Sequence, residues 1–202
     1  MTQTMTDTGP ALALPAGGST RRRHVLTVGI GLAGVASVMT FASLAAAYLA
    51  VRALSHPWPP PKVSLDNYLG TTMSITLIMS AITVEWGVQA LRQGNRRQAV
   101  SGLVLTPLFG LAFLNLLWYL VSKLGFGPAS HPYGTLVYAF VVVIVVDVAL
   151  GIGFLLITLM RIAGNQVTAA DPAVARAAGW FWHTVVLAWL VAFMALYVFQ
   201  HR

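Results

Sequence analysis

Two carboxylic acids stand inside long apolar stretches of this sequence, and they are its first candidates for chemistry. Residues 133–161 are mostly apolar and carry one charge between their ends, Asp147, close to their middle. A helix rises about 1.5 Å per residue, so this stretch can cross a bilayer core of about 30 Å. A charged carboxylate at that depth costs on the order of 3 kcal/mol. We therefore expect Asp147 to face protein or trapped water, to stay protonated and to need a hydrogen-bond partner.

Asp147 has two interpretations. It relays protons or pairs with a substrate cation, or it is a structural group that forms a hydrogen bond with the backbone or a hydroxyl of a neighbouring helix. The sequence places no Lys or Arg at membrane depth to pair with it. This absence favours the structural interpretation.

Glu85 is the second carboxylate inside an apolar stretch, and it lies about two helical turns, on the order of 10 Å, before Arg92. Arg92 can reach back toward it, and Gln89 shares its helix face four residues on. These neighbours favour an interfacial Glu85. The alternative is a small proton-coupled transporter that uses Asp147 and Glu85, although the sequence lacks an internal repeat and a pair of broken helices.

Three more polar side chains, Ser37, Asn115 and His183, are candidates for buried groups of functional weight. For His183, an interfacial ring bonded to backbone is favoured. The chain has five histidines and no cysteine. The histidines lie at or near the ends of the apolar stretches, without a pair at a spacing of three or four, and neither a nucleotide loop nor a Ser/His/Asp arrangement is present. We expect neither a catalytic residue nor a haem or metal site within the chain.

The composition indicates which kind of fold holds these polar side chains in place. The 202 residues are 57% hydrophobic and 8% charged, whereas soluble domains are about 25% charged. The apolar runs are continuous, which favours helices over a barrel. We predict an all-α bundle of five transmembrane helices, preceded by a disordered tail over residues 1–24 that ends in basic residues. The membrane domain covers residues 25–202, with spans at about 25–53, 67–92, 98–122, 133–161 and 172–200.

Local signals mark the helix ends and contacts. Gly94–Asn95 predicts a turn between the second and third helices, and Asp171–Pro172 predicts the N-cap and first residue of the fifth. Small residues at Gly29, Ala33 and Ser37, and at Gly151 and Gly153, predict close helix packing. Five tryptophans are expected to anchor the helices at the membrane interfaces. They are Trp58, Trp86, Trp118, Trp180 and Trp182.

Basic residues are divided unequally between the two sets of helix ends. Eight of the twelve Lys and Arg side chains fall on the side of the N-terminus. The positive-inside rule then places the N-terminus in the cytoplasm, and the net charge of +7 is explained without nucleic acid. The eight are Arg21, Arg22, Arg23, Arg92, Arg96, Arg97, Arg161 and Arg176.

Three motifs in a fixed order carry a resemblance to a known family. Trp-Pro-Pro at residues 58–60 precedes Thr-Val-Glu-Trp at 83–86, and Tyr-Gly-Thr at 133–135 opens the fourth helix. Ala-Ala-Gly-Trp-Phe-Trp-His at 177–183 is followed by Trp189. In this order and with these loop lengths, residues 25–200 resemble subunit III of the haem–copper oxidases (cytochrome c oxidase), in its shorter five-helix bacterial form.

The chain departs from the family at several polar positions. Ser37 stands where the family has a buried Glu in this helix, and the two histidines of the family's next-to-last helix fall at Ile144 and Asp147. A family Asp falls at Val186, and a Tyr-Glu-Tyr-like segment is matched by Leu-Trp-Tyr at 117–119. The resemblance therefore implies a retained bundle with a largely replaced set of buried polar groups.

The resemblance implies an accessory, non-redox subunit of a terminal oxidase in aerobic respiration. Such a subunit packs beside subunit I, in one complex with subunit II, binds phospholipid and helps the complex keep its activity. Haem and copper reside in the partner subunits, and the protein is multi-pass in the bacterial plasma membrane. A subunit of a related nitric oxide reductase, the transporter described above and a free-standing membrane scaffold are the alternatives.

Overall fold

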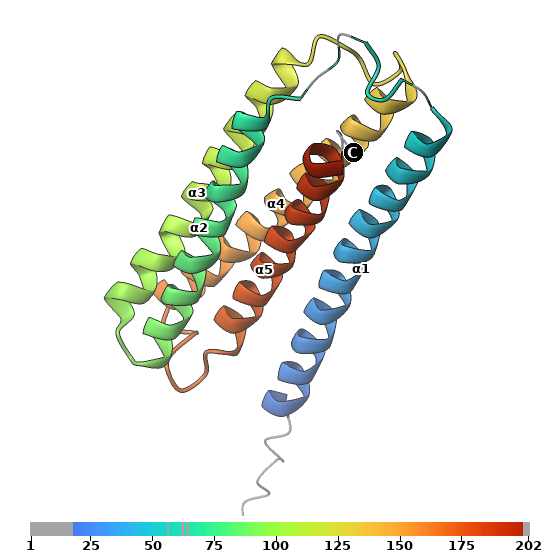
Figure 1. The fold of residues 1–202 in the computed structure, drawn as a ribbon. Coiled ribbons are helices and arrows are strands. Elements are labelled where there is room, and N and C mark those ends of the chain that lie inside the picture. The colour runs from blue at the N-terminus through green and yellow to red at the C-terminus, as the bar shows by residue number, and fades with distance from the viewer. Residues whose placement is uncertain (1–17, 56, 62, 64, 200–202) are drawn as a thin grey trace, which may run out of the picture.

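The computed structural model describes residues 18–55, 57–61, 63 and 65–199, in which five long helices follow one another and the last continues into a short π-helix (Figure 1). Within these residues the only β pairing is an isolated bridge between Thr168 and Asp171. The prediction of an all-α bundle of five helices is confirmed. The elements are α1 (Gly18–Leu54), α2 (Asn67–Arg92), α3 (Arg96–Lys123), α4 (Pro132–Ala163), α5 (Ala173–Phe193) and η1 (Met194–Val198).

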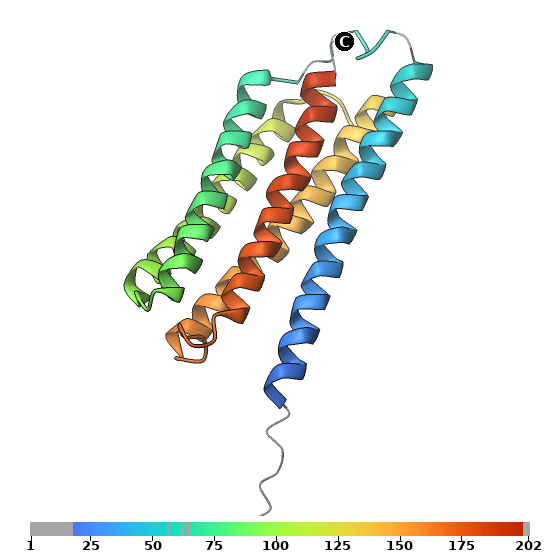
Figure 2. The same ribbon diagram turned by 60° about the horizontal axis from the view of Figure 1, so that its bottom comes forward.

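The helices form two layers. α5 lies between α1 and α2 in one layer, and α3 and α4 form the other (Figures 1 and 2). α5 contacts α1, α2 and α4, so it is the central helix of the bundle. The connections are short, and each helix therefore runs antiparallel to the one before it.

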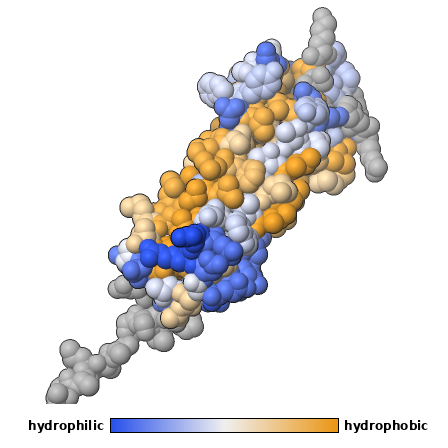
Figure 3. All heavy atoms as spheres, turned by 90° about the vertical axis from the view of Figure 1, so that its left-hand side faces the viewer, coloured by the Kyte–Doolittle hydropathy of each residue, from blue (hydrophilic) through white to orange (hydrophobic). Residues whose placement is uncertain are grey.

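All five helices are long and apolar enough to cross a membrane. The side of the bundle that carries α2 and α3 shows an apolar band between two hydrophilic ends (Figure 3). Large apolar side chains such as Leu150 and Ile157 point outward from the bundle. An apolar outer surface is what lipid-facing helices require. The spans are Val28–Leu54, Asn67–Arg92, Arg96–Lys123, Pro132–Ala163 and Ala173–Val198.

The α2–α3 contact is held close by two glycines. A Cβ atom added to Gly102 would lie 2.7 Å from the Cα atom of Gly87, so the two backbones touch. Beside them, the hydroxyls of Thr83 and Thr106 are 3.0 Å apart and share a hydrogen bond. Small residues let helices approach in a membrane, where van der Waals contact replaces the hydrophobic effect as the driving force.

The turn between α2 and α3 forms as predicted. Gly94 has a φ angle of +78°, in the left-handed region that favours glycine. Asn95 is the N-cap of α3, and its side chain accepts a hydrogen bond of 3.2 Å from the backbone N–H of Gln98. Arg96 then reaches α4, where Nη2 donates to the carbonyl oxygens of Ile162 and Ala163 at 3.0 Å each. This cation stabilises the C-terminal end of α4.

Two helix starts differ from the sequence analysis. As a helix, α1 begins at Gly18, within the tail expected over residues 1–24, whereas the part of it that can span a membrane is Val28–Leu54; residues 1–17 lie outside the described residues. α5 begins at Ala173, because its N-cap is Pro172 with a ψ angle of 13°. Asp171, the predicted N-cap, therefore stands one residue before the observed N-cap. Its carboxylate still accepts a hydrogen bond of 3.4 Å from the backbone N–H of Ala173.

Candidate functional site

The buried carboxylate of Asp147 meets a hydroxyl on another helix. The hydroxyl of Ser37 on α1 donates a hydrogen bond to Oδ2 of Asp147 on α4. Asp147 is 9% exposed and lies near the middle of its helix, while Ser37 is half-buried. A neighbouring hydroxyl was one of the partners expected for Asp147, although here the hydroxyl donates.

Close packing surrounds this pair. One turn from Ser37, the ring of Phe41 lies 6.1 Å from the ring of Phe140 on α4, measured between centroids. A Cβ atom on Gly151, four residues after Asp147, would lie 2.8 Å from the ring of Trp182. α1, α4 and α5 therefore enclose a carboxyl–hydroxyl pair among apolar and aromatic side chains, and the pair can hold or exchange a proton within one hydrogen bond.

The predicted small-residue contacts are only partly formed. Gly151 packs against Trp182, but Gly29 and Gly153 have open space where a Cβ atom would stand. The close approach of α1 to α5 is made by Gly34 instead, where a Cβ atom would lie 2.8 Å from Cγ2 of Thr184. The stripe of small residues predicted a contact but not which of its members would form it.

Glu85 and His183 lie in a different place from Asp147. Both are exposed, and with Gln89 they line a groove between α2 and α5. Among the residues that the structure describes, Glu85 has neither a hydrogen bond nor an ion pair, so Arg92 does not contact it. His183 is bonded to backbone as expected, with Nδ1 2.7 Å from the carbonyl oxygen of Gly179.

The remaining candidates lie mostly on the outer surface. Asn115 is exposed on α3 instead of buried. Trp118 and Trp180 are 76% and 74% exposed, and Trp86 faces outward as well. Trp58 is half-buried, and its indole N–H donates to the Tyr48 hydroxyl at 3.1 Å.

Trp182 differs from its predicted role as an interfacial anchor. Its side chain is 0% exposed, and its indole N–H donates to the hydroxyl of Ser80 on α2 at 2.9 Å. Trp189, seven residues on, is also buried and donates to Ser74 on α2 at 3.0 Å. The reason is helical periodicity: a spacing of seven places both indoles on one face of α5, and that face packs against α2. Neither serine was predicted as a partner, although the seven-residue spacing of the two tryptophans is visible in the sequence.

Within the described part of the chain, no group of three His, Asp or Glu side chains is placed to hold a metal ion. The candidate side chains therefore form one carboxyl–hydroxyl pair and three indole–hydroxyl pairs, and one groove carries Glu85, Gln89 and His183. These are the contacts of a helix bundle, with one buried acid at its centre.

Several known proteins have sequences similar to that of this chain. The chain is 32% identical over 146 residues to cytochrome c oxidase subunit 3 of Coturnix japonica, which covers 71% of this chain and 56% of that protein. It is 28% identical over 142 residues to the subunit of Paracentrotus lividus, covering 69% and 54%. For the Spodoptera frugiperda protein the identity is 30% over 142 residues, covering 69% and 97%. The chain thus spans little more than half the length of the first two relatives.

The family as a whole matches over a longer region. The sequence model of the family described as cytochrome c oxidase subunit III matches residues 18–201, which include all five helices and η1. The protein is accordingly a multi-pass membrane protein. From its residues, its helices and this match, the chain belongs to the cytochrome c oxidase subunit III family.

Proposed function

We propose that this protein is an accessory, non-redox subunit of a haem–copper terminal oxidase, which stabilises the catalytic subunit I and works beside subunit II. The observation that carries the proposal is the family match over residues 18–201. Haem and copper belong to the partner subunits in this proposal, and this chain supplies packing surface. Its location is the bacterial plasma membrane, with the N-terminus in the cytoplasm according to the positive-inside rule.

The buried acid supports a structural contribution of this kind. In the alignment implied by the family motifs, Ser37 replaces a Glu and Asp147 replaces a His. The two replaced positions touch in this structure. In this structure one acid and its hydrogen-bonding partner therefore stand at a contact between α1 and α4. A buried acid that is hydrogen-bonded by a neighbouring helix supports a structural role for this contact.

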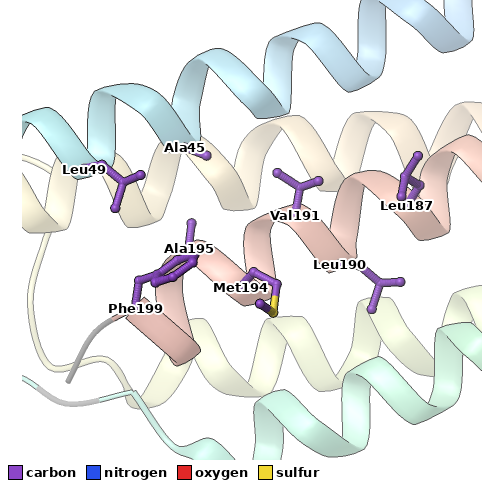
Figure 4. Close-up of a pocket in the computed structure, with 8 residues that line it drawn as sticks. All are labelled: Ala45, Leu49, Leu187, Leu190, Val191, Met194, Ala195 and Phe199. Carbon is purple, nitrogen blue, oxygen red and sulfur yellow. The ribbon is translucent and has the colours of Figure 1, made fainter. Parts of the chain in front are cut away.

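Lipid binding is the second part of the proposal. An apolar groove of about 330 Å³ lies between α1 and the C-terminal half of the α5–η1 region (Figure 4). Such a groove, open to the membrane and lined by alkyl side chains, fits a phospholipid acyl chain. Its lining residues are Ala45, Leu49, Leu187, Leu190, Val191, Met194, Ala195 and Phe199.

The proposal is tested by purification of the tagged chain from native membranes in mild detergent. We expect co-purification with a haem-bearing subunit, identified by a visible spectrum and mass spectrometry, and phospholipid in the extract. Recovery of the chain alone, without a haem spectrum, would contradict the proposal. The haem type and the partner's mass separate a terminal oxidase from a nitric oxide reductase.

A proton-coupled transporter is the alternative from a different class. It would use Asp147 and Glu85, which the structure places in two separate sites. The substitution Asp147→Asn distinguishes a transporter from an oxidase subunit. A transporter should lose proton-coupled flux in proteoliposomes, whereas an oxidase subunit should change mainly in assembly or in the durability of the complex.

A further inference from the structure

A mostly apolar groove that carries three polar side chains opens on the bundle surface between α2 and α5. Its volume is about 570 Å³. Ile78 and Ile82 of α2 line its apolar part, and Glu85 and Gln89 line its polar part together with His183 of α5. The groove adjoins α5 on the side opposite the apolar groove of Figure 4, so both open between helices of the same layer.

Glu85 is the group in this groove that needs a partner. It is exposed, and among the described residues it has neither a hydrogen bond nor an ion pair. It lies about 10 Å inside the helix end marked by Arg92. An ionisable side chain that faces lipid at membrane depth is unfavourable, and such groups in membrane proteins pair with a complementary group.

The groove presents hydrogen-bond acceptors on both of its walls. Nδ1 of His183 is 2.7 Å from the carbonyl oxygen of Gly179, and since a carbonyl can only accept, Nδ1 carries the hydrogen. The other ring nitrogen, Nε2, is then an acceptor in the neutral ring. On the α2 wall, the carboxylate of Glu85 is also an acceptor. The complementary group is a cationic donor, such as a lysine ammonium or an arginine guanidinium.

A cationic donor could come from a protein helix or from the amine headgroup of a lipid. In an aminophospholipid the ammonium lies on the water side of the phosphate. On α2 the order of charges is the reverse, because Arg92 lies on the water side of Glu85. A lipid would therefore place its ammonium beside Arg92 and its phosphate toward Glu85, and both contacts would be repulsive. A side chain from a transmembrane helix has no such constraint.

We infer that a transmembrane helix of another oxidase subunit docks in the groove between α2 and α5. It places a Lys or Arg side chain against Glu85, with His183 as the second acceptor. This inference rests on the proposed function, because it takes its partner from the same complex. Beyond the proposed function, it specifies which face of the bundle the partner contacts, the membrane depth of that contact and the charge of the partner's side chain.

Photo-crosslinking in the intact complex tests the contact. p-Benzoylphenylalanine is placed at Ile82, which lines the groove and is 58% exposed, and in a matched control at Leu156 of α4. Leu156 is 48% exposed, lies within about a turn of the same depth and faces outward from the other layer. We expect position 82 to crosslink to one oxidase subunit, within about one turn of a Lys or Arg. A crosslink from position 82 to lipid alone would overturn the inference.

Substitution of Glu85 tests the charge. Glu85→Gln and Glu85→Leu should each lower the recovery of the haem-bearing partner about tenfold or more while the chain stays folded. If the groove faces only lipid, both variants should leave recovery unchanged, and this result would refute the inference. If a variant fails to fold, the crosslink at position 82 decides. A wild-type chain that recovers no haem-bearing partner contradicts the proposed function as well, whereas wild-type recovery with insensitive variants contradicts only the docked cation.

Discussion

Ser37 donates its hydroxyl hydrogen to Asp147 across the contact between α1 and α4, in the buried part of the bundle. This bond gives the acid its polar neighbour, while the surrounding packing is apolar and aromatic. A buried group that loses its partner costs more than the hydrogen bond itself contributes. The pair is therefore the part of the bundle whose substitution should be most informative.

Ser37→Ala should destabilise the protein by about 1 kcal/mol, because it leaves Asp147 buried without its hydroxyl partner. The measurement is unfolding of the purified chain in detergent. Ser43→Ala is the control, because Ser43 is on the same helix, is exposed and bonds only the carbonyl oxygen of Thr40. Equal stability of the two variants would show that the Ser37 bond contributes nothing.

Exchange of the Ser37 and Asp147 side chains in a double variant should restore the stability that each single substitution loses. Ser37→Asp places two carboxyls together, and Asp147→Ser leaves two hydroxyls. The double variant again has one of each. We expect a coupling free energy on the order of 1 kcal/mol in the double-mutant cycle. A coupling near zero would mean that the two positions act independently.

Ser80→Ala and Ser74→Ala should each cost about 1 kcal/mol, because each leaves the indole N–H of a buried tryptophan without an acceptor. The two losses should add, since the contacts have separate partners. Ser101→Ala is the control, because Ser101 is exposed and bonds the carbonyl oxygen of Arg97. Thermal unfolding followed by tryptophan fluorescence measures all three variants.

Gly102→Ala should separate α2 from α3 and destabilise the bundle by roughly 1–3 kcal/mol, because its Cβ atom would meet the backbone of Gly87. Gly153→Ala is the matched control, with open space for its Cβ atom on α4. There the helix-favouring methyl group should be neutral or slightly stabilising. If Gly102→Ala and Gly153→Ala have the same free energy of unfolding, the α2 and α3 backbones do not touch at Gly102.

Arg96→Ala should cost about 0.5 kcal/mol, because it removes the cation bonded to the last carbonyls of α4. Arg97→Ala is an especially close control. It removes the same charge from the same end of α3, so any effect on membrane orientation is shared. Hydrogen exchange at the C-terminal turn of α4 should rise only in Arg96→Ala, and equal exchange in both variants would refute the capping role.

The sequence by itself determined the number of helices, the turn at Gly94 and the position of Asp147 near the middle of its helix. These features depend on local properties: apolar length decides whether a helix can span a membrane, and a positive φ angle favours glycine. The family motifs were also readable in sequence, since they depend on order and spacing.

The tertiary structure alone decided which helix faces meet. Trp180 and Trp182 are two residues apart in one aromatic segment, yet one faces outward and the other fills the core, because residues at this spacing lie on different faces of a helix. In the same way, the sequence pointed to Ser37 and Asp147 separately, and only the packing of α1 against α4 made them partners. Periodicity shows that residues share a face, but only the packing of the helices selects the partner of that face.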